Sequence, residues 1–96
     1  MTHNCDDSTI KHALHLGLAV EFLADAAGTV SYVNRAGTAT AEEIHRTCTV
    51  VLQSRFAAVM TTDEWIDALR TGKAVERDTI FASSQRARRQ NSRGVG

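Results

Sequence analysis

Two His–Cys pairs contain the residue types that bind metals or carry out nucleophilic catalysis. His45 and Cys48 are three residues apart, so a helix would place both side chains on one face. His3 and Cys5 form a second pair near the start of the chain. Imidazole and thiolate groups are the usual ligands of zinc, and a thiol next to a histidine base can act as a nucleophile.

The spacing of these pairs does not favour either chemistry. Strong zinc sites combine two close-spaced ligand pairs of known separation, which these residues do not reproduce. The sequence also has no HExxH motif, no Gly-rich phosphate loop and no recognisable nucleophile turn. We therefore expect no metal, no cofactor and no enzymatic activity, with Cys48 buried in a helix and His45 beside it at the surface.

Arginines near the end of the sequence form its clearest electrostatic feature. Residues 1–72 carry five basic and nine acidic side chains, whereas residues 73–96 carry six basic and two acidic ones. Such a basic segment can bind phosphates by releasing counterions, but it has no aromatic residue on which bases could stack. Any contact with nucleic acid would be independent of base sequence and would use four residues: Arg86, Arg88, Arg89 and Arg93.

Length and composition indicate one small globular domain. The chain has 96 residues, of which 43% are hydrophobic and 23% charged. We expect a flexible N-terminus over 1–7, a domain over 8–82 and a basic, disordered tail over 83–96. Two distant cysteines do not form a disulfide framework, which favours reduced thiols and a cytoplasmic location. No apolar run is long enough to span a membrane, and the sequence shows no secretory signal.

Local patterns predict an α+β fold, with a small antiparallel sheet and two or three helices. A helix is expected from Thr9 to about Leu18, followed by a strand over 19–24 that could instead continue the helix. Gly28 can turn the chain into a β-branched and aromatic strand over 29–33, which would pair with the preceding strand. An all-α bundle is the alternative.

Two stretches carry the capping-box spacing that marks helix starts. In Thr40-Ala-Glu-Glu43 and Thr61-Thr-Asp-Glu64, the threonine and the glutamate can each bond the other's backbone amide. Apolar residues recur at helical spacing after Thr40, which predicts one long helix over 40–60. The second helix is expected to end at Gly72, a residue type common at helix C-termini.

The stretch "FLADAAGTVSYVNRAG" resembles the start of a PAS domain. That family has an apolar strand, an aspartate, a glycine turn and a second strand ending in "YVN", and six residues match the spacing: Asp25, Gly28, Val30, Tyr32, Val33 and Asn34. The later stretch "EWIDALRTGKAVERDTIF" is similar to the helix, "TG" turn and strand of the same family. The chain departs from the family pattern after Phe81, where two further long strands are missing.

The resemblance implies a sensory or protein-interaction module that acts by binding. Such a module would use an apolar pocket or a homodimer face, and we expect six residues to form it: Val20, Phe22, Tyr32, Ile44, Val51 and Phe56. The alternative is a small, mainly helical regulator associated with nucleic acid, which would bind phosphate through the basic tail. A strand signal together with a dimer would favour the first hypothesis, and a continuous basic helix would favour the second.

Overall fold

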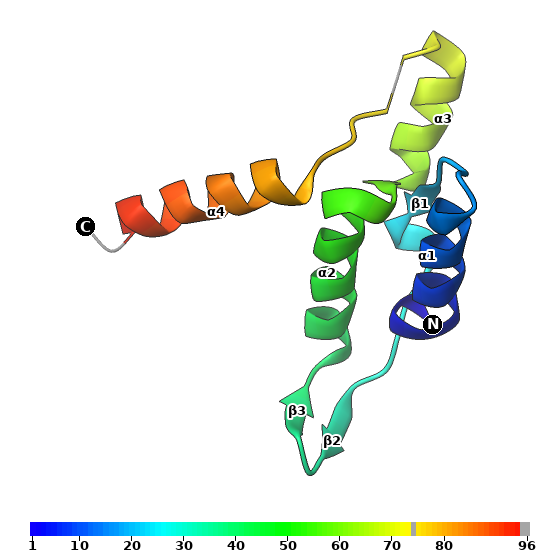
Figure 1. The fold of residues 1–96 in the computed structure, drawn as a ribbon. Helices are drawn as coiled ribbons and strands as arrows, with labels where there is room; N and C mark the ends of the chain where they lie inside the picture. The colour runs from blue at the N-terminus through cyan, green and yellow to red at the C-terminus, as the bar shows by residue number, and fades with distance from the viewer. Residues whose placement is uncertain (74, 95–96) are drawn as a thin grey trace.

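The computed structural model describes residues 1–73 and 75–94 and has an α+β fold, as the sequence predicts (Figure 1). Its helices and strands follow in chain order: η1 (Thr2–Asp6), α1 (Asp7–His15), β1 (Glu21–Leu23), η2 (Ala24–Ala26), β2 (Tyr32–Asn34), β3 (Gly37–Ala39), α2 (Ala41–Val51), η3 (Leu52–Phe56), β4 (Ala58–Met60), α3 (Thr62–Thr71) and α4 (Ile80–Gly94). The three η segments are short helical turns.

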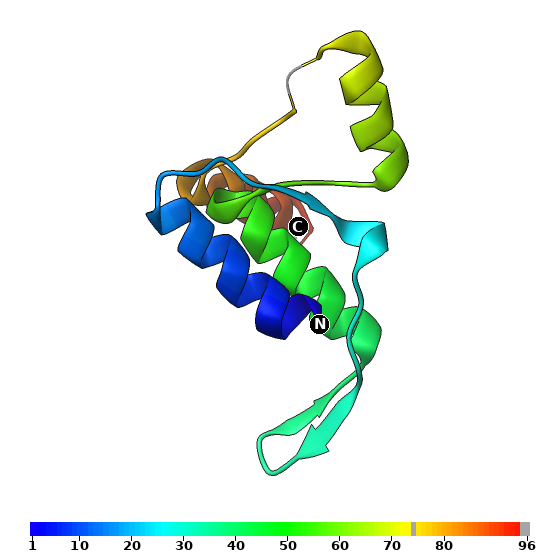
Figure 2. The same cartoon turned by 90° about the vertical axis from the view of Figure 1, so that its right-hand side faces the viewer.

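Helices α1 and α2 lie side by side, and the apolar core forms where they meet β1 (Figure 2). Four buried residues from α1, β1, η3 and the position directly after η3 make up this core: Ile10, Phe22, Leu52 and Ala57. Partly buried side chains, including Val20 and Phe56, pack around it. The core is small for a chain of this length, and its stability depends on few contacts.

Strand β1 pairs with β4 in a parallel sheet of two strands, with Phe22 opposite Val59. The prediction that β1 pairs with the strand after Gly28 is therefore wrong. A parallel pair needs a long crossover between its strands, and here α2 provides it. Local hydrophobic periodicity reports which segments are extended but not which distant segment each one pairs with.

The second strand pair is a hairpin that projects from the body of the molecule (Figure 1). Strands β2 and β3 pair antiparallel, with Tyr32 opposite Ala39. Asn34 Oδ1 accepts a hydrogen bond of 2.9 Å from the amide of Ala36, and Gly37 has a φ of 142° that favours glycine. The antiparallel part of the predicted sheet thus lies in this arm, away from the core.

Both predicted capping boxes are present. The hydroxyl of Thr40 accepts from the Glu43 amide while the Glu43 carboxylate accepts from the Thr40 amide, and Thr61 and Glu64 repeat the arrangement. Gly72 ends α3 with a φ of 70°, as expected for a helix C-cap.

The predicted long helix over 40–60 is wrong in its last part. Helical backbone continues from α2 through η3 to Phe56, but Ala57 is extended and Val59 lies in β4. The apolar spacing could not show this change, because pairing with β1 decides the conformation of these residues.

The C-terminal helix α4 extends away from α1 and α2 (Figure 1). It includes most of the segment for which the sequence indicated a disordered tail. The Arg86 guanidinium forms an ion pair with Asp78, which precedes the helix. The proposed domain boundaries stay a prediction.

Leu52 tests the importance of the small core, because its side chain is fully buried at 0% exposure. We expect Leu52→Ala to lower the free energy of unfolding by about 2–5 kcal/mol, through lost apolar contacts and the cavity left behind. Val50→Ala, at the end of α2, is the control, since Val50 is 59% exposed and should change stability by about 0.5 kcal/mol or less. Urea unfolding followed by circular dichroism measures both, and equal effects would contradict this core.

Asp25 links η2 to the start of α3. Its Oδ1 accepts from the Thr62 hydroxyl at 2.8 Å and from the Thr62 amide at 2.9 Å. The hydroxyl bond is the largest cause that holds the pKa of Asp25 below its usual value. A depressed pKa in the folded state adds stability that is complete above the unfolded-state pKa and is lost as pH falls through the folded-state pKa.

We expect Thr62→Ala to raise the pKa of Asp25 toward its usual value, because the hydroxyl donor is removed. Thr62→Ser keeps a hydroxyl and is the matched control. Carboxyl chemical shifts recorded by NMR across an acid titration measure the change. An unchanged Asp25 titration in Thr62→Ala would show that this hydroxyl bond does not form in solution.

Candidate functional site

A polar cluster ties the first residues of the chain to two other segments. The side chain of Thr2 is fully buried. Its amide donates to the Gly28 carbonyl at 2.9 Å, and its hydroxyl lies 3.1 Å from the same carbonyl and 2.8 Å from His45 Nδ1. Thr2 therefore fixes the N-terminal turn against both the loop after η2 and helix α2.

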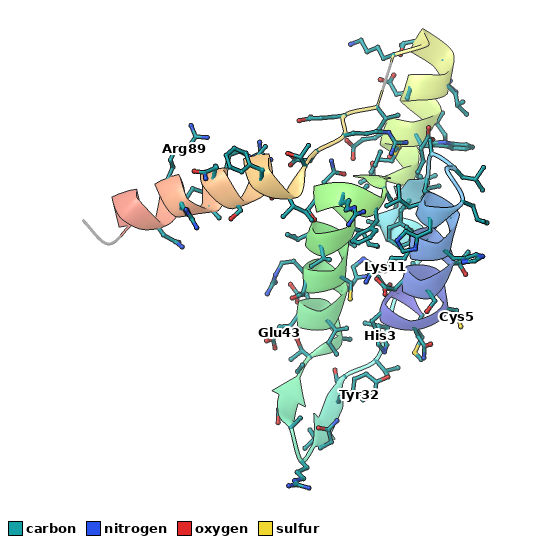
Figure 3. The ribbon with its side chains drawn as sticks, viewed as in Figure 1. His3, Cys5, Lys11, Tyr32, Glu43 and Arg89 are labelled. Atoms are coloured by element: carbon teal, nitrogen blue, oxygen red, sulfur yellow. The ribbon has the colours of Figure 1, made fainter. Side chains whose placement is uncertain are left out.

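His3 extends this cluster toward the hairpin. Its Nδ1 lies 2.6 Å from the Thr29 hydroxyl and its Nε2 lies 2.9 Å from the Tyr32 hydroxyl. The His3 and Tyr32 rings meet edge to face with centroids 5.4 Å apart (Figure 3). Both ring nitrogens of His3 are thus engaged by hydroxyl groups, which orients the ring.

Cys5 lies directly after a break in the helical backbone. Asn4 has a φ of −120° and a ψ of −105°, so the chain changes direction before it enters α1 at Asp7. Cys5 is exposed, and its side chain lies on the outer side of the N-terminal turn, away from α2 (Figure 3).

The second thiol has a different environment. Cys48 on α2 is half-buried. Burial raises its pKa, the negative charge of Asp7 adds to this rise, and the positive charge of Lys11 opposes it. A thiol with a raised pKa is a poor source of thiolate at neutral pH. Cys5 is therefore the better candidate nucleophile of the two.

The histidines of the two His–Cys pairs contact hydroxyl groups from other segments of the chain. His3 and His45 both take part in the Thr2 cluster, so the prediction of a free surface position for His45 missed its bond to a buried hydroxyl. Within residues 1–73 and 75–94, no group of three or more His, Cys, Asp or Glu side chains is arranged to hold a metal ion.

The six residues predicted to form a binding face do not come together in one pocket. Phe22 is in the core, with Val20 and Phe56 packed around it. Tyr32 and Ile44 line a shallow cavity of about 300 Å³ beside the hairpin, and Val51 is exposed on α2. Their role in binding stays a prediction.

The four predicted phosphate-binding arginines lie on α4. Arg86 is held by Asp78, and Arg89 is directed away from the helix axis (Figure 3). Arg88 is exposed, and the side chain of Arg93 lies outside the described side chains. Arg86, Arg88 and Arg89 are all exposed, and of these Arg86 is paired with Asp78.

A second cavity is formed by residues that do not include Cys5. It has a volume of about 630 Å³ and is lined by residues between Thr49 and Ser83. Four of its lining side chains are acidic: Glu64, Asp67, Glu76 and Asp78. The candidate nucleophile does not line this cavity.

A solved structure matches almost the whole chain. It is a crystal structure from Burkholderia xenovorans LB400, described as that of a "putative isochorismatase". The two proteins share 63% sequence identity with a TM-score of 0.90, and the match covers 96% of this chain and 44% of the other. This chain therefore spans less than half the length of the protein that it matches. No protein-family model and no curated protein sequence matches it.

This match corrects the functional predictions made from the sequence. The resemblance to PAS domains is wrong, because a chain of 63% identity, matched at a TM-score of 0.90, is described as a "putative isochorismatase". The expectation of a non-enzymatic signalling module is wrong for the same reason, since the matching protein is described as an enzyme. The match does not favour the nucleic-acid regulator either.

The sequence predicted that Cys5 lies in a flexible N-terminal segment, residues 1–7. The signal that could have found it is the helix start directly after it, since Asp7 and Ser8 are typical helix-capping residues.

The two thiols should differ in reactivity. We expect iodoacetamide at neutral pH to alkylate Cys5 several-fold faster than Cys48, because Cys5 is exposed while burial raises the pKa of Cys48. Peptide mass spectrometry over a time course measures both rates in one sample, and urea-unfolded chain is the control in which the rates should converge. Faster labelling of Cys48 in the folded chain would contradict the structure.

Proposed function

We propose that this chain is part of a hydrolase related to the isochorismatases and that Cys5 is its nucleophile. The observation that carries the proposal is the match at 63% identity and a TM-score of 0.90 over 96% of the chain. The exposure of Cys5 at the start of α1 supports the choice of this thiol.

The chemistry proposed for Cys5 is acyl transfer to water. The thiolate adds to the acyl carbon of an ester or amide, the leaving group departs with a proton, and a thioester forms. Water then adds to the thioester carbon and releases the carboxylic acid and the free thiol. The net reaction is hydrolysis, and it needs no oxidant or reductant.

In this proposal the polar cluster holds the nucleophile in position. Thr2 and His3 belong to the same turn as Cys5, and their bonds to Gly28, Thr29 and Tyr32 fix that turn. A general base must also take the thiol proton. No hydrogen bond to the Cys5 thiol is formed by the part of the chain that the structure describes, so we propose that the base belongs to the rest of a longer enzyme.

The proposed substrates are small molecules with a hydrolysable acyl bond. Isochorismate is assayed as a separate case, because the matching protein is described as a "putative isochorismatase" and the bond cleaved in isochorismate is an enol ether, on which the acyl-transfer step does not operate. The structure has no helix long and apolar enough to cross a membrane within its described residues. The cytoplasmic location and the homodimer expected from the sequence stay proposals, and size-exclusion chromatography with light scattering measures the second.

Replacement of the nucleophile should abolish hydrolysis. We expect Cys5→Ser to lower the hydrolysis rate by about 100-fold or more, because a serine hydroxyl without an activating base is a much weaker nucleophile. Cys48→Ser is the matched control and should keep the activity. Both are assayed on a panel of esters and amides, after circular dichroism has confirmed folding.

The assay is run on the 96-residue chain alone and on the chain mixed with the part of the Burkholderia protein that it does not match. Full activity in Cys5→Ser would exclude this thiol as the nucleophile. A folded wild-type sample without hydrolysis in either form would overturn the proposed function.

A further inference from the structure

The hydroxyl of Thr2 has two polar contacts but carries a single proton. It lies 3.1 Å from the Gly28 carbonyl oxygen and 2.8 Å from His45 Nδ1. The Thr2 side chain is fully buried, and buried polar groups in native proteins are hydrogen-bonded. The hydroxyl must therefore donate to one of these two atoms and accept from the other.

The Gly28 carbonyl fixes the direction of the first bond. A carbonyl oxygen can only accept, so the Thr2 hydroxyl donates its proton to it. The Thr2 amide, at 2.9 Å, donates to the same oxygen, which has two lone pairs. If the hydroxyl proton pointed to His45 instead, two oxygens with partial negative charge would face each other and repel. The Thr2 oxygen thus keeps only its lone pairs for the imidazole.

This arrangement determines which nitrogen of His45 carries the proton. Nδ1 has to donate to the Thr2 oxygen at 2.8 Å, and a neutral imidazole has a single N–H. Neutral His45 is then the Nδ1–H tautomer, with an unprotonated Nε2. The imidazolium form also carries a proton on Nδ1, so the bond is compatible with both charge states of the ring.

The bond from His45 joins three segments that are distant in the sequence. His45 is half-buried on α2, whose first turn is held by the capping box of Thr40 and Glu43. Gly28 belongs to the loop after η2, and Thr2 belongs to the N-terminal turn η1. Turn η1 packs against α2, and His45 provides a polar link across this contact.

The turn that Thr2 anchors also carries Cys5. Between the two residues, Asn4 has a φ of −120° and a ψ of −105°, which depart from helical values. The direction in which the Cys5 side chain leaves the turn therefore depends on how the turn is held. Thr2 is buried whereas Cys5 is exposed, so the fixed end of the turn is the one that His45 contacts.

We propose that His45 is a positioning residue, which as an Nδ1–H donor to the Thr2 hydroxyl sets the N-terminal turn and thereby the orientation of the Cys5 thiol. The inference rests on the proposed function, in which Cys5 is the nucleophile. It adds α2 to the parts of the chain that determine the hydrolysis rate, although His45 does not touch the reacting atoms. A misplaced nucleophile slows the chemical step, because the reacting atoms must approach in a defined geometry.

The tautomer of His45 is tested by NMR of the imidazole nitrogens at a pH at which the ring is neutral. We expect a protonated Nδ1 and an unprotonated Nε2 in the wild-type chain. Thr2→Val removes the hydroxyl at similar size and should abolish this preference. His15, which is exposed on α1, is the internal control and should show the tautomer mixture of a solvated ring. A wild-type His45 ring protonated at Nε2 would overturn the inference.

Two substitutions at His45 separate positioning from a general effect on stability. The side-chain nitrogen of asparagine is as many bonds from Cα as Nδ1 of histidine, so His45→Asn keeps a donor at this place. His45→Leu removes the donor, although leucine is the better helix former of the two. Loss of helix stability would therefore harm His45→Asn more, whereas loss of the bond to Thr2 harms His45→Leu more. His15→Leu is the matched control at an exposed histidine.

We expect His45→Leu to lower kcat for ester or amide hydrolysis by about tenfold or more while KM changes by less than about twofold. His45→Asn should keep kcat within about threefold of wild type, and His15→Leu should leave it unchanged. The assay uses the chain alone or its mixture with the unmatched part of the Burkholderia protein, whichever hydrolyses the substrates. Full kcat in His45→Leu, or equal losses in His45→Leu and His45→Asn, would contradict a positioning role.

Backbone chemical shifts distinguish failure of this inference from failure of the proposed function, because they need no substrate. We expect the shifts of Asn4 and Cys5 to keep their wild-type values in His45→Asn and to move toward random-coil values in His45→Leu, with those of α3 unchanged. If the wild-type chain hydrolyses nothing, movement confined to His45→Leu supports the placement of Cys5 by His45, while the hydrolase function fails. Unchanged shifts in His45→Leu would overturn the inference. If His45→Leu does not fold, the tautomer of the wild-type ring decides.

Discussion

The parallel pairing of β1 with β4 is the constraint on which the rest of this structure depends. It joins segments separated by the hairpin and α2, and this crossover places α2 beside α1. The core forms because Phe22 of β1 and Leu52 of η3, which follows α2, then meet. Without the pairing, α2 and α3 would keep their capping boxes, but α1 and α2 would lose the surface against which they pack.

The sequence predicted the elements that depend on local chemistry. The capping boxes at Thr40 and Thr61 and the C-cap at Gly72 need only residues within one turn, and the structure confirms all three. The partner of β1 and the end of the long helix at Phe56 depend on contacts across the chain. No single-sequence pattern contains that information, because apolar spacing is the same for several pairings.

The candidate site shows the same division. The sequence shows which residue types the candidate site contains. It pairs Cys48 with His45, because these two residues are close neighbours in the chain. The fold instead groups His45 with Thr2, at a separation of 43 residues, and leaves Cys5 exposed at the helix start. The likeness to an isochorismatase could not be inferred from motif spacing, since it rests on identity across nearly the whole chain.

The projecting hairpin also determines where this chain can be divided. Arg35 lies in the exposed turn between β2 and β3, and a basic residue at such a tip is a site for trypsin. A cut there leaves α1 and β1 in one fragment and α2 and β4 in the other. The strand pairing, the shared core and the Thr2–His45 contact still join the two fragments without a covalent link. The tip is therefore the natural position for a split-protein junction or an inserted reporter domain.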